Sequence, residues 1–170
     1  MNLRRTFAWR GGFALVLACF GLASRAQEER SNVFDDPFLR VTRSLALCPV
    51  PEGPLYTAAQ ARSQSHIRAE KGTTCHDWGR CRLPNAYLYD KEIIPRVATF
   101  IQRDDRFQTT SVWILGQRRW VYLKGCVSSE AQRDQLEAEV RLIDDVEAVI
   151  NELMVGVTGT PRYEVERDAK

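Results

Sequence analysis

The sequence predicts an α+β fold in which a helix, a β-hairpin, a second helix and a third strand follow one another within residues 90–157. The hairpin is indicated by two runs rich in Val, Ile, Trp and Tyr, residues 111–115 and 119–127. Such runs suit paired strands, and the turn expected around residues 116–117 is short enough to join them. Helical periodicity precedes and follows this hairpin, and a third β-rich run closes the unit at residues 148–155.

The first expected helix lies within residues 90–107. One apolar stripe at helical spacing runs through it: Ile93, Val97, Phe100 and Ile101. Pro95 lacks a backbone N–H and disfavours helical backbone at the residue before it. The helix proper is therefore expected to begin near Ile94, or an earlier turn to be kinked there.

Both faces of the expected sheet carry apolar side chains. Because strand side chains alternate, one face of the second strand holds Trp120, Tyr122, Lys124 and Cys126. The other face holds Val121, Leu123 and Val127. Apolar residues on both faces require two covers. Helices can supply one, and Cys126 points to the face that needs the other.

The second expected helix starts at a capping box. The hydroxyl of Ser129 can accept from a free backbone N–H, and the amide of Gln132 can reach back to the start of the helix. An apolar stripe follows: Ala131, Leu136, Val140 and Ile143. The charged residues between them are expected to form a solvated face.

Residues 90–157 resemble a BON domain, named after bacterial OsmY and nodulation proteins. The resemblance rests on Ile93 and Val97 of the first helix and on three elements after it: Val112 and Ile114; Leu123, Gly125 and Val127; and Val146, Val149, Asn151, Leu153 and Val155. Asp145 stands where the family often has Gly, and Asp adopts positive φ more easily than most residues. The resemblance implies two helices on one face of a three-stranded mixed sheet.

Residues 1–26 are expected to be a signal peptide. Arginines are followed by an apolar run too short to span a bilayer, and small residues precede Gln27. Two alternatives are a lipoprotein that is acylated at Cys19, and a twin-arginine signal at Arg4 and Arg5. We therefore expect an exported, periplasmic chain.

Residues 27–89 are expected to be a Cys- and Pro-containing extension without a second copy of the hairpin pattern. We expect a mobile lead over residues 27–37, a short helix over 38–47, and a helix capped by Thr57 from Ala58 to about Lys71. A tight loop is expected over residues 72–81. Residues 158–170 are expected to be a polar, frayed tail.

The charge is unevenly distributed. Removal of residues 1–26 takes away four arginines and no acid, so the formal net charge falls from +2 to −2. Residues 38–89 hold seven basic and three acidic residues, whereas residues 90–157 hold nine and twelve. Attraction to anionic lipid is therefore expected from the extension. The alternative is that this asymmetry helps the two parts dock on each other.

The exported chain retains four cysteines, an even number that predicts two disulfides in an oxidising compartment. Of three connectivities, we favour Cys75–Cys81, which closes a small loop, and Cys48–Cys126. The second bond would pin the Pro-rich segment after Cys48 over the open face of the sheet. Structural zinc is the alternative use of these residues, but no C-x-x-C spacing occurs.

The sequence contains no recognisable catalytic, phosphate-binding or dinucleotide-binding motif, and we expect neither an enzyme nor a cofactor. The resemblance implies a binding module that meets anionic phospholipid at the membrane surface and supports envelope integrity. The alternative is a module that binds an envelope protein. No nucleic-acid partner is expected. The candidate binding residues are Arg62, Arg68, Arg80 and Arg82 in the extension, with Arg118, Arg119 and Trp120 at the hairpin turn.

Overall fold

The structure is a computed structural model that describes residues 28–166. The expected signal peptide and Cys19 lie outside these residues. The α-helices are α1 (Ala58–Asp77), α2 (Asp90–Arg103) and α3 (Glu130–Val140), and two 3-10 helices, Ala86–Tyr89 and Asp105–Phe107, flank α2. The strands are β1 (Phe38–Arg40), β2 (Ser111–Gln117), β3 (Trp120–Val127), β4 (Ala148–Asn151) and β5 (Met154–Val155).

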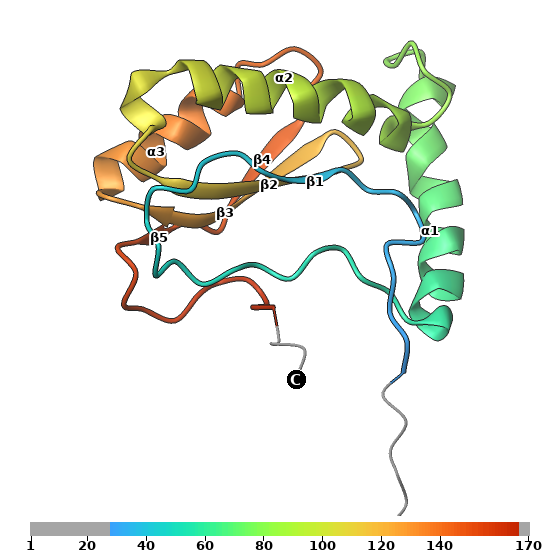
Figure 1. The fold of residues 1–170 in the computed structure, drawn as a ribbon. Coiled ribbons are helices and arrows are strands. Elements are labelled where there is room, and N and C mark those ends of the chain that lie inside the picture. The colour runs from blue at the N-terminus through green and yellow to red at the C-terminus, as the bar shows by residue number, and fades with distance from the viewer. Residues whose placement is uncertain (1–27, 167–170) are drawn as a thin grey trace, which may run out of the picture.

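The strands form one mixed sheet in the order β1-β2-β3-β4, with β5 also paired to β3. β1, β2 and β3 are antiparallel, whereas β4 and β5 run parallel to β3. Helices α2 and α3 lie over one face, and α1 stands beside the sheet at its hairpin end (Figure 1). The predicted α+β order is confirmed, and the sheet is wider than the three strands that the resemblance implied.

The turn between β2 and β3 lies two residues later than the sequence suggested. Gln117 pairs with Trp120, so Arg118 and Arg119 form a two-residue turn. Gly116 is a strand residue instead. A Cβ at Gly116 would overlap the side chain of Ile94, so glycine is needed there for α2 to pack closely on β2.

The third strand is interrupted between β4 and β5, yet its register against β3 is the same on both sides of the break. The break lies opposite Gly125, whose φ is +117° and where a Cβ would overlap the carbonyl oxygen of Ser111. At the break, the Asn151 side chain accepts from the N–H of Leu153 and donates to α3 through Glu137. These contacts explain the Gly and Asn of the motifs that resemble a BON domain.

The extension contributes to the sheet, so the predictions of a helix over residues 38–47 and of a mobile lead were wrong. β1 pairs with the outer edge of β2, whose backbone groups would otherwise lack strand partners. Ahead of it, Ser31 pairs with Tyr56, and Asp36 is buried against Arg68. Local composition predicted a helix, and a non-local pairing produced a strand instead.

Helix α1 also extends beyond its predicted end, because Gly72 does not terminate it. The capping box of Thr57 and Gln60 is present as predicted. A Cβ at Gly72 would overlap the side chain of Asn85, which caps the 3-10 helix before α2. Gly72 therefore permits close packing, and the helix continues through Cys75 to Asp77, where a loop was expected.

The sheet has a core on each face. The larger core lies under α2 and α3 and includes Ile93, Val97, Leu123 and Leu136. The smaller core, on the other face, gathers Cys48, Trp113, Cys126, Met154 and Tyr163.

The smaller core is covered by the segment after Cys48 together with the C-terminal segment, which pairs at Pro51 and Val165. The Tyr163 hydroxyl also donates to the carbonyl of Pro49, at 2.9 Å. The prediction of a frayed tail is therefore wrong for these residues. Disulfides Cys48–Cys126 and Cys75–Cys81 are both present, as predicted.

The two disulfides should contribute unequally to stability. They join residues separated by 78 and 6 positions. Loop-closure entropy then predicts a loss of about 4 kcal/mol in the free energy of unfolding for Cys48→Ser with Cys126→Ser, against about 2 kcal/mol for the other pair. Denaturant titration of the two double variants measures this difference. Equal losses, or the reverse order, would contradict the larger contribution expected from Cys48–Cys126.

Candidate functional site

A hollow of about 500 Å³ opens between the last turns of α1 and the β2–β3 turn. Figure 1 shows these two elements side by side. The hollow is lined by Lys71, Thr74, Cys75, Trp78, Arg80, Ala86, Arg118, Arg119 and Glu147. Four of these residues are basic and one is acidic, so the hollow is a concave site with an excess of positive charge.

The turn that presents the two arginines has an unusual backbone. Arg118 and Arg119 have φ values of +57° and +67°, a conformation favoured by Gly and Asn in two-residue hairpin turns. Asp90 supports it from the start of α2. Its two carboxylate oxygens accept from the backbone N–H groups of Arg118 and Arg119, each at 2.7 Å. The carboxylate thus offsets strain that the turn sequence does not relieve by itself.

Asp90 is only 1% exposed. Burial raises the pKa of its carboxyl to about 7, although the hydrogen bonds from the two N–H groups act in the opposite direction. The group that supports the turn therefore titrates close to neutral pH.

Arg119 lies at the inner wall of the hollow. Its Nε donates to the carbonyl of Asp145, at 2.9 Å, and its guanidinium lies over the ring of Tyr89. Its Nη1 lies 3.4 Å from Sγ of Cys75 and 3.2 Å from Sγ of Cys81. The φ of Asp145 is +70°, as expected at the position where the family often has Gly. Arg119 therefore joins the turn to the disulfide.

Of the other cations of the hollow, Lys71 and Arg80 are exposed and Arg118 is partly exposed. The guanidinium of Arg118 lies 4.7 Å from the ring centre of Trp120, and that of Arg80 lies 4.8 Å from Trp78. Trp78 is 67% exposed. Among the ion pairs found within residues 28–166, none involves Lys71 or any of the three arginines that line the hollow. Their charge is thus available to an anionic ligand.

The candidate binding residues that the sequence indicated fall into three groups in the structure. Arg80, Arg118 and Arg119 line the hollow, and Trp120 lies beneath Arg118. Arg62 is exposed on α1 but does not line the hollow, and Arg82 is paired with Glu92.

Arg68 requires a correction. Its side chain is 11% exposed, pairs with Asp36, and lies between the rings of Phe34 and Tyr87. It holds α1 against the residues before β1, so its charge is not available to a surface ligand.

Lys71 and Trp78 were not singled out in the sequence. Lys71 shares one face of α1 with Thr74 and Cys75, and Trp78, the C-cap residue after α1, continues that face, because residues three, four and seven apart share a helical face. This spacing is visible in the sequence only if the helix is continued past Gly72. Because the helix was expected to end near Lys71, the contribution of this helical face to the hollow was not predicted.

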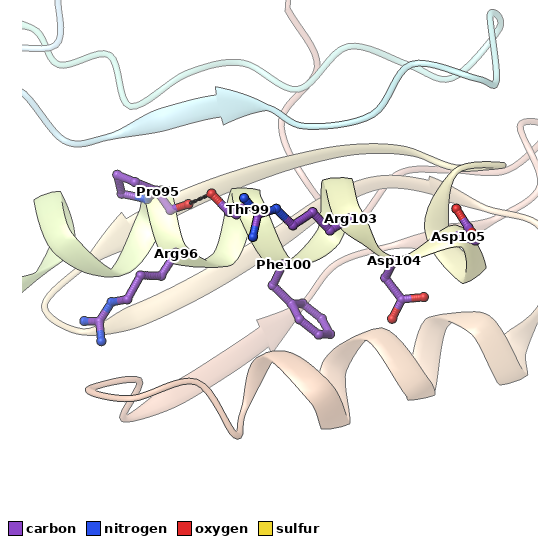
Figure 2. Close-up of a pocket in the computed structure, with 7 residues that line it drawn as sticks. All are labelled: Pro95, Arg96, Thr99, Phe100, Arg103, Asp104 and Asp105. Atoms are coloured by element: carbon purple, nitrogen blue, oxygen red, sulfur yellow. Dashed lines mark hydrogen bonds between the residues drawn. The ribbon is translucent and has the colours of Figure 1, made fainter.

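A second hollow, of about 830 Å³, follows the outer side of α2 and is drawn in Figure 2. Its lining residues all come from α2 and the two residues after it. Phe100 and Asp104 point towards α3, whereas Pro95 lies on the other side of the helix (Figure 2). Because these side chains do not converge, and because basic and acidic groups are mixed, this groove does not form a comparable site.

Comparison with known protein families identifies the domain that carries the turn. The BON domain model matches residues 89–156. Residues 89–156 are a BON domain. No curated protein and no solved structure matches the chain. BON domains are non-catalytic binding modules, and the match includes Asp90 and the two arginines of the turn.

The hollow is only partly built from the BON domain. Arg118, Arg119 and Glu147 lie within the matched residues, whereas Lys71, Cys75 and Trp78 precede them. The site is therefore a composite of the domain and the extension that packs beside it. Over residues 28–166, no helix combines the length and the apolar character that a bilayer crossing requires.

Titration of Asp90 should make the stability of the fold depend on pH. Since the pKa is about 7 in the folded chain and near 3.8 when unfolded, the folded state binds more protons between these values. The free energy of unfolding of the native chain should therefore fall, relative to Asp90→Asn, as the pH rises from 4 to 8. Denaturant titrations of both proteins at several pH values test this. A relative gain for the native chain over that range would show that the hydrogen bonds outweigh burial.

Proposed function

We propose that the chain is a non-catalytic binding module of the cell envelope that associates with anionic phospholipid at the membrane surface and supports envelope integrity. The observation that carries this proposal is the set of four basic side chains around the composite hollow, which form no ion pair within residues 28–166, with an exposed tryptophan at its edge. The BON domain supports a binding role and leaves the ligand open.

The charge at the hairpin end differs from that of the domain as a whole. Residues 90–157 carry more acidic than basic groups, but the acidic groups include partners of nearby arginines, such as Glu92 with Arg82 and Asp145 with Arg96. Four of the basic side chains that form no ion pair within residues 28–166 gather where α1 meets the turn. An anionic surface would therefore orient this end of the molecule towards itself.

The position of Trp78 suits binding at the boundary between lipid headgroups and acyl chains. Its ring is mostly exposed and Arg80 lies over it, which places an amphipathic ring beside a cation. Tryptophan favours this depth of the membrane, and arginine pairs with phosphate there.

Export to the periplasm is part of the proposal. Disulfides such as these two form and persist in oxidising compartments, and the charged and apolar pattern of residues 1–26 suits a signal peptide. Such a location would place the hollow within reach of membrane surfaces in the envelope.

A protein partner in the periplasm is the second candidate. Leu88, in the 3-10 helix that contributes Ala86 to the hollow, is exposed like Trp78. Exposed apolar side chains beside cations also suit an acidic protein surface.

Flotation with vesicles should show electrostatic binding that decreases as salt increases. A basic side chain near an anionic surface contributes about 1 kcal/mol, so neutralising Lys71, Arg80 and Arg118 to Gln should weaken binding on the order of 100-fold. Neutral vesicles should bind far less of the native protein.

The matched control neutralises three exposed arginines near the opposite end of the sheet that form no ion pair within residues 28–166: Arg43, Arg103 and Arg162. This variant should bind anionic vesicles nearly as well as the native chain. Equal weakening by both triple variants would mean that net charge, and not the hollow, controls binding. No flotation under any condition would favour the protein partner.

Trp78→Ala should weaken vesicle binding at high salt as well, because the lost contact is apolar. The control is Leu47→Ala, since Leu47 is 80% exposed but lies close to the other end of β2, where Leu45 contacts Ser111. Partitioning of both variants is measured by flotation. A larger effect of Leu47→Ala would place the contact surface at that other end.

A further inference from the structure

The two disulfides lie in different surroundings. Cys48–Cys126 belongs to the smaller core, where both residues are buried. Cys75–Cys81 is partly exposed, and Cys75 lines the basic hollow. A thiol in solution therefore has access to the second bond while the first is shielded by the fold.

The cation nearest to the exposed bond is Arg119. Its Nη1 lies within 3.4 Å of both sulfur atoms. A guanidinium at this distance stabilises a thiolate, and a stabilised thiolate is a better leaving group in thiol–disulfide exchange. Asp90 holds the turn that positions Arg119, so the cation is already in place before the bond breaks.

The two sulfurs of this bond are not equivalent. Cys75 faces the hollow, whereas Cys81 is packed against the larger core and lies closer to Arg119. Cys75 is also in the last turn of α1, where the helix dipole disfavours negative charge. Attack at Cys75, with Cys81 as the leaving thiolate, agrees with all of these features.

We propose that Cys75–Cys81 is an exchange-active disulfide that reacts at Cys75 with thiols bearing negative charge. The thiolate of the incoming thiol attacks Sγ of Cys75 and forms a mixed disulfide with it. The Cys75–Cys81 bond breaks, and its electron pair remains on Sγ of Cys81 as a thiolate beside Arg119. The incoming thiol is oxidised in this step and Cys81 is reduced.

The charge of the hollow gives this reaction its selectivity. Lys71, Arg80, Arg118 and Arg119 surround the approach to Cys75, with Glu147 as the acidic residue among the lining groups. An anionic thiol is attracted to this field and a cationic thiol is repelled, so their rates should differ at low salt. The inference does not depend on membrane binding, since it concerns the covalent chemistry of one wall of the hollow.

The test compares 2-mercaptoethanesulfonate with cysteamine on the protein purified after export. Each rate is divided by the rate of the same thiol with a small-molecule disulfide, which removes differences in intrinsic reactivity. The anionic thiol should be faster on the order of tenfold at low salt, and the difference should shrink as salt is added. Equal normalised rates would overturn the selectivity.

Mapping of the quenched reaction tests the assignment of the two sulfurs. After alkylation with iodoacetamide and digestion without reductant, the sulfonate adduct should be on Cys75 and the alkyl group on Cys81, while Cys48–Cys126 remains intact. An adduct mainly on Cys81, or reduction of Cys48–Cys126 at a similar rate, would overturn the proposal.

Arg119→Gln should slow the anionic thiol, and Arg119→Lys should restore part of the rate because it keeps the charge. The control, Arg103→Gln, removes an exposed charge from the far end of α2 and should leave the rate unchanged. An exchange rate that is the same in both Arg119 variants as in the native protein would show that this cation does not contribute to the reaction. Vesicle flotation of the same proteins distinguishes this failure from a failure of the membrane proposal.

Discussion

The turn between β2 and β3 depends on a carboxylate that is 28 residues earlier in the chain. Asp90 begins α2, yet both of its oxygens are occupied by the N–H groups of the turn. The buried charge is costly, as the raised pKa of its carboxyl shows. Three properties follow from this contact: α2 is fixed against the hairpin, Arg118 and Arg119 keep an unfavourable backbone, and both arginines line the hollow beside α1.

Periodicity was sufficient to predict α3, the hairpin strands and most of α2, although α2 begins at Asp90 and includes Pro95, where a later start or a kink was expected. The even number of cysteines, the short Cys75–Cys81 spacing and the parity of one strand predicted both disulfides. Two predictions based on glycine were wrong. Gly116 was assigned to a turn and Gly72 to a helix end, but each is glycine because another element packs closely against it. The support that Asp90 gives to the turn was equally invisible, since the sequence does not show which distant residues meet.

The hollow illustrates how an extension can change what a small domain is able to bind. The BON domain supplies Arg118 and Arg119 on a rigid turn. Helix α1 and its C-cap supply Lys71, Trp78 and Cys75 of the partly exposed disulfide. The buried pair of Arg68 and Asp36 holds α1 against the residues before β1, and Asp36 also accepts from Nε2 of Gln117 in β2. A residue expected to bind a ligand therefore helps to position the two parts of the hollow.

The disulfide connectivity also bears on how the chain must mature. The bond between Cys75 and Cys81 is nested within the loop closed by Cys48 and Cys126. In a chain that enters an oxidising compartment from its N-terminus, Cys48 arrives first and its correct partner arrives last. An oxidase that joins cysteines in order of arrival would link Cys48 to Cys75, and that error is removed only by thiol–disulfide isomerisation. Efficient production of the native protein should therefore require an isomerase as well as an oxidase.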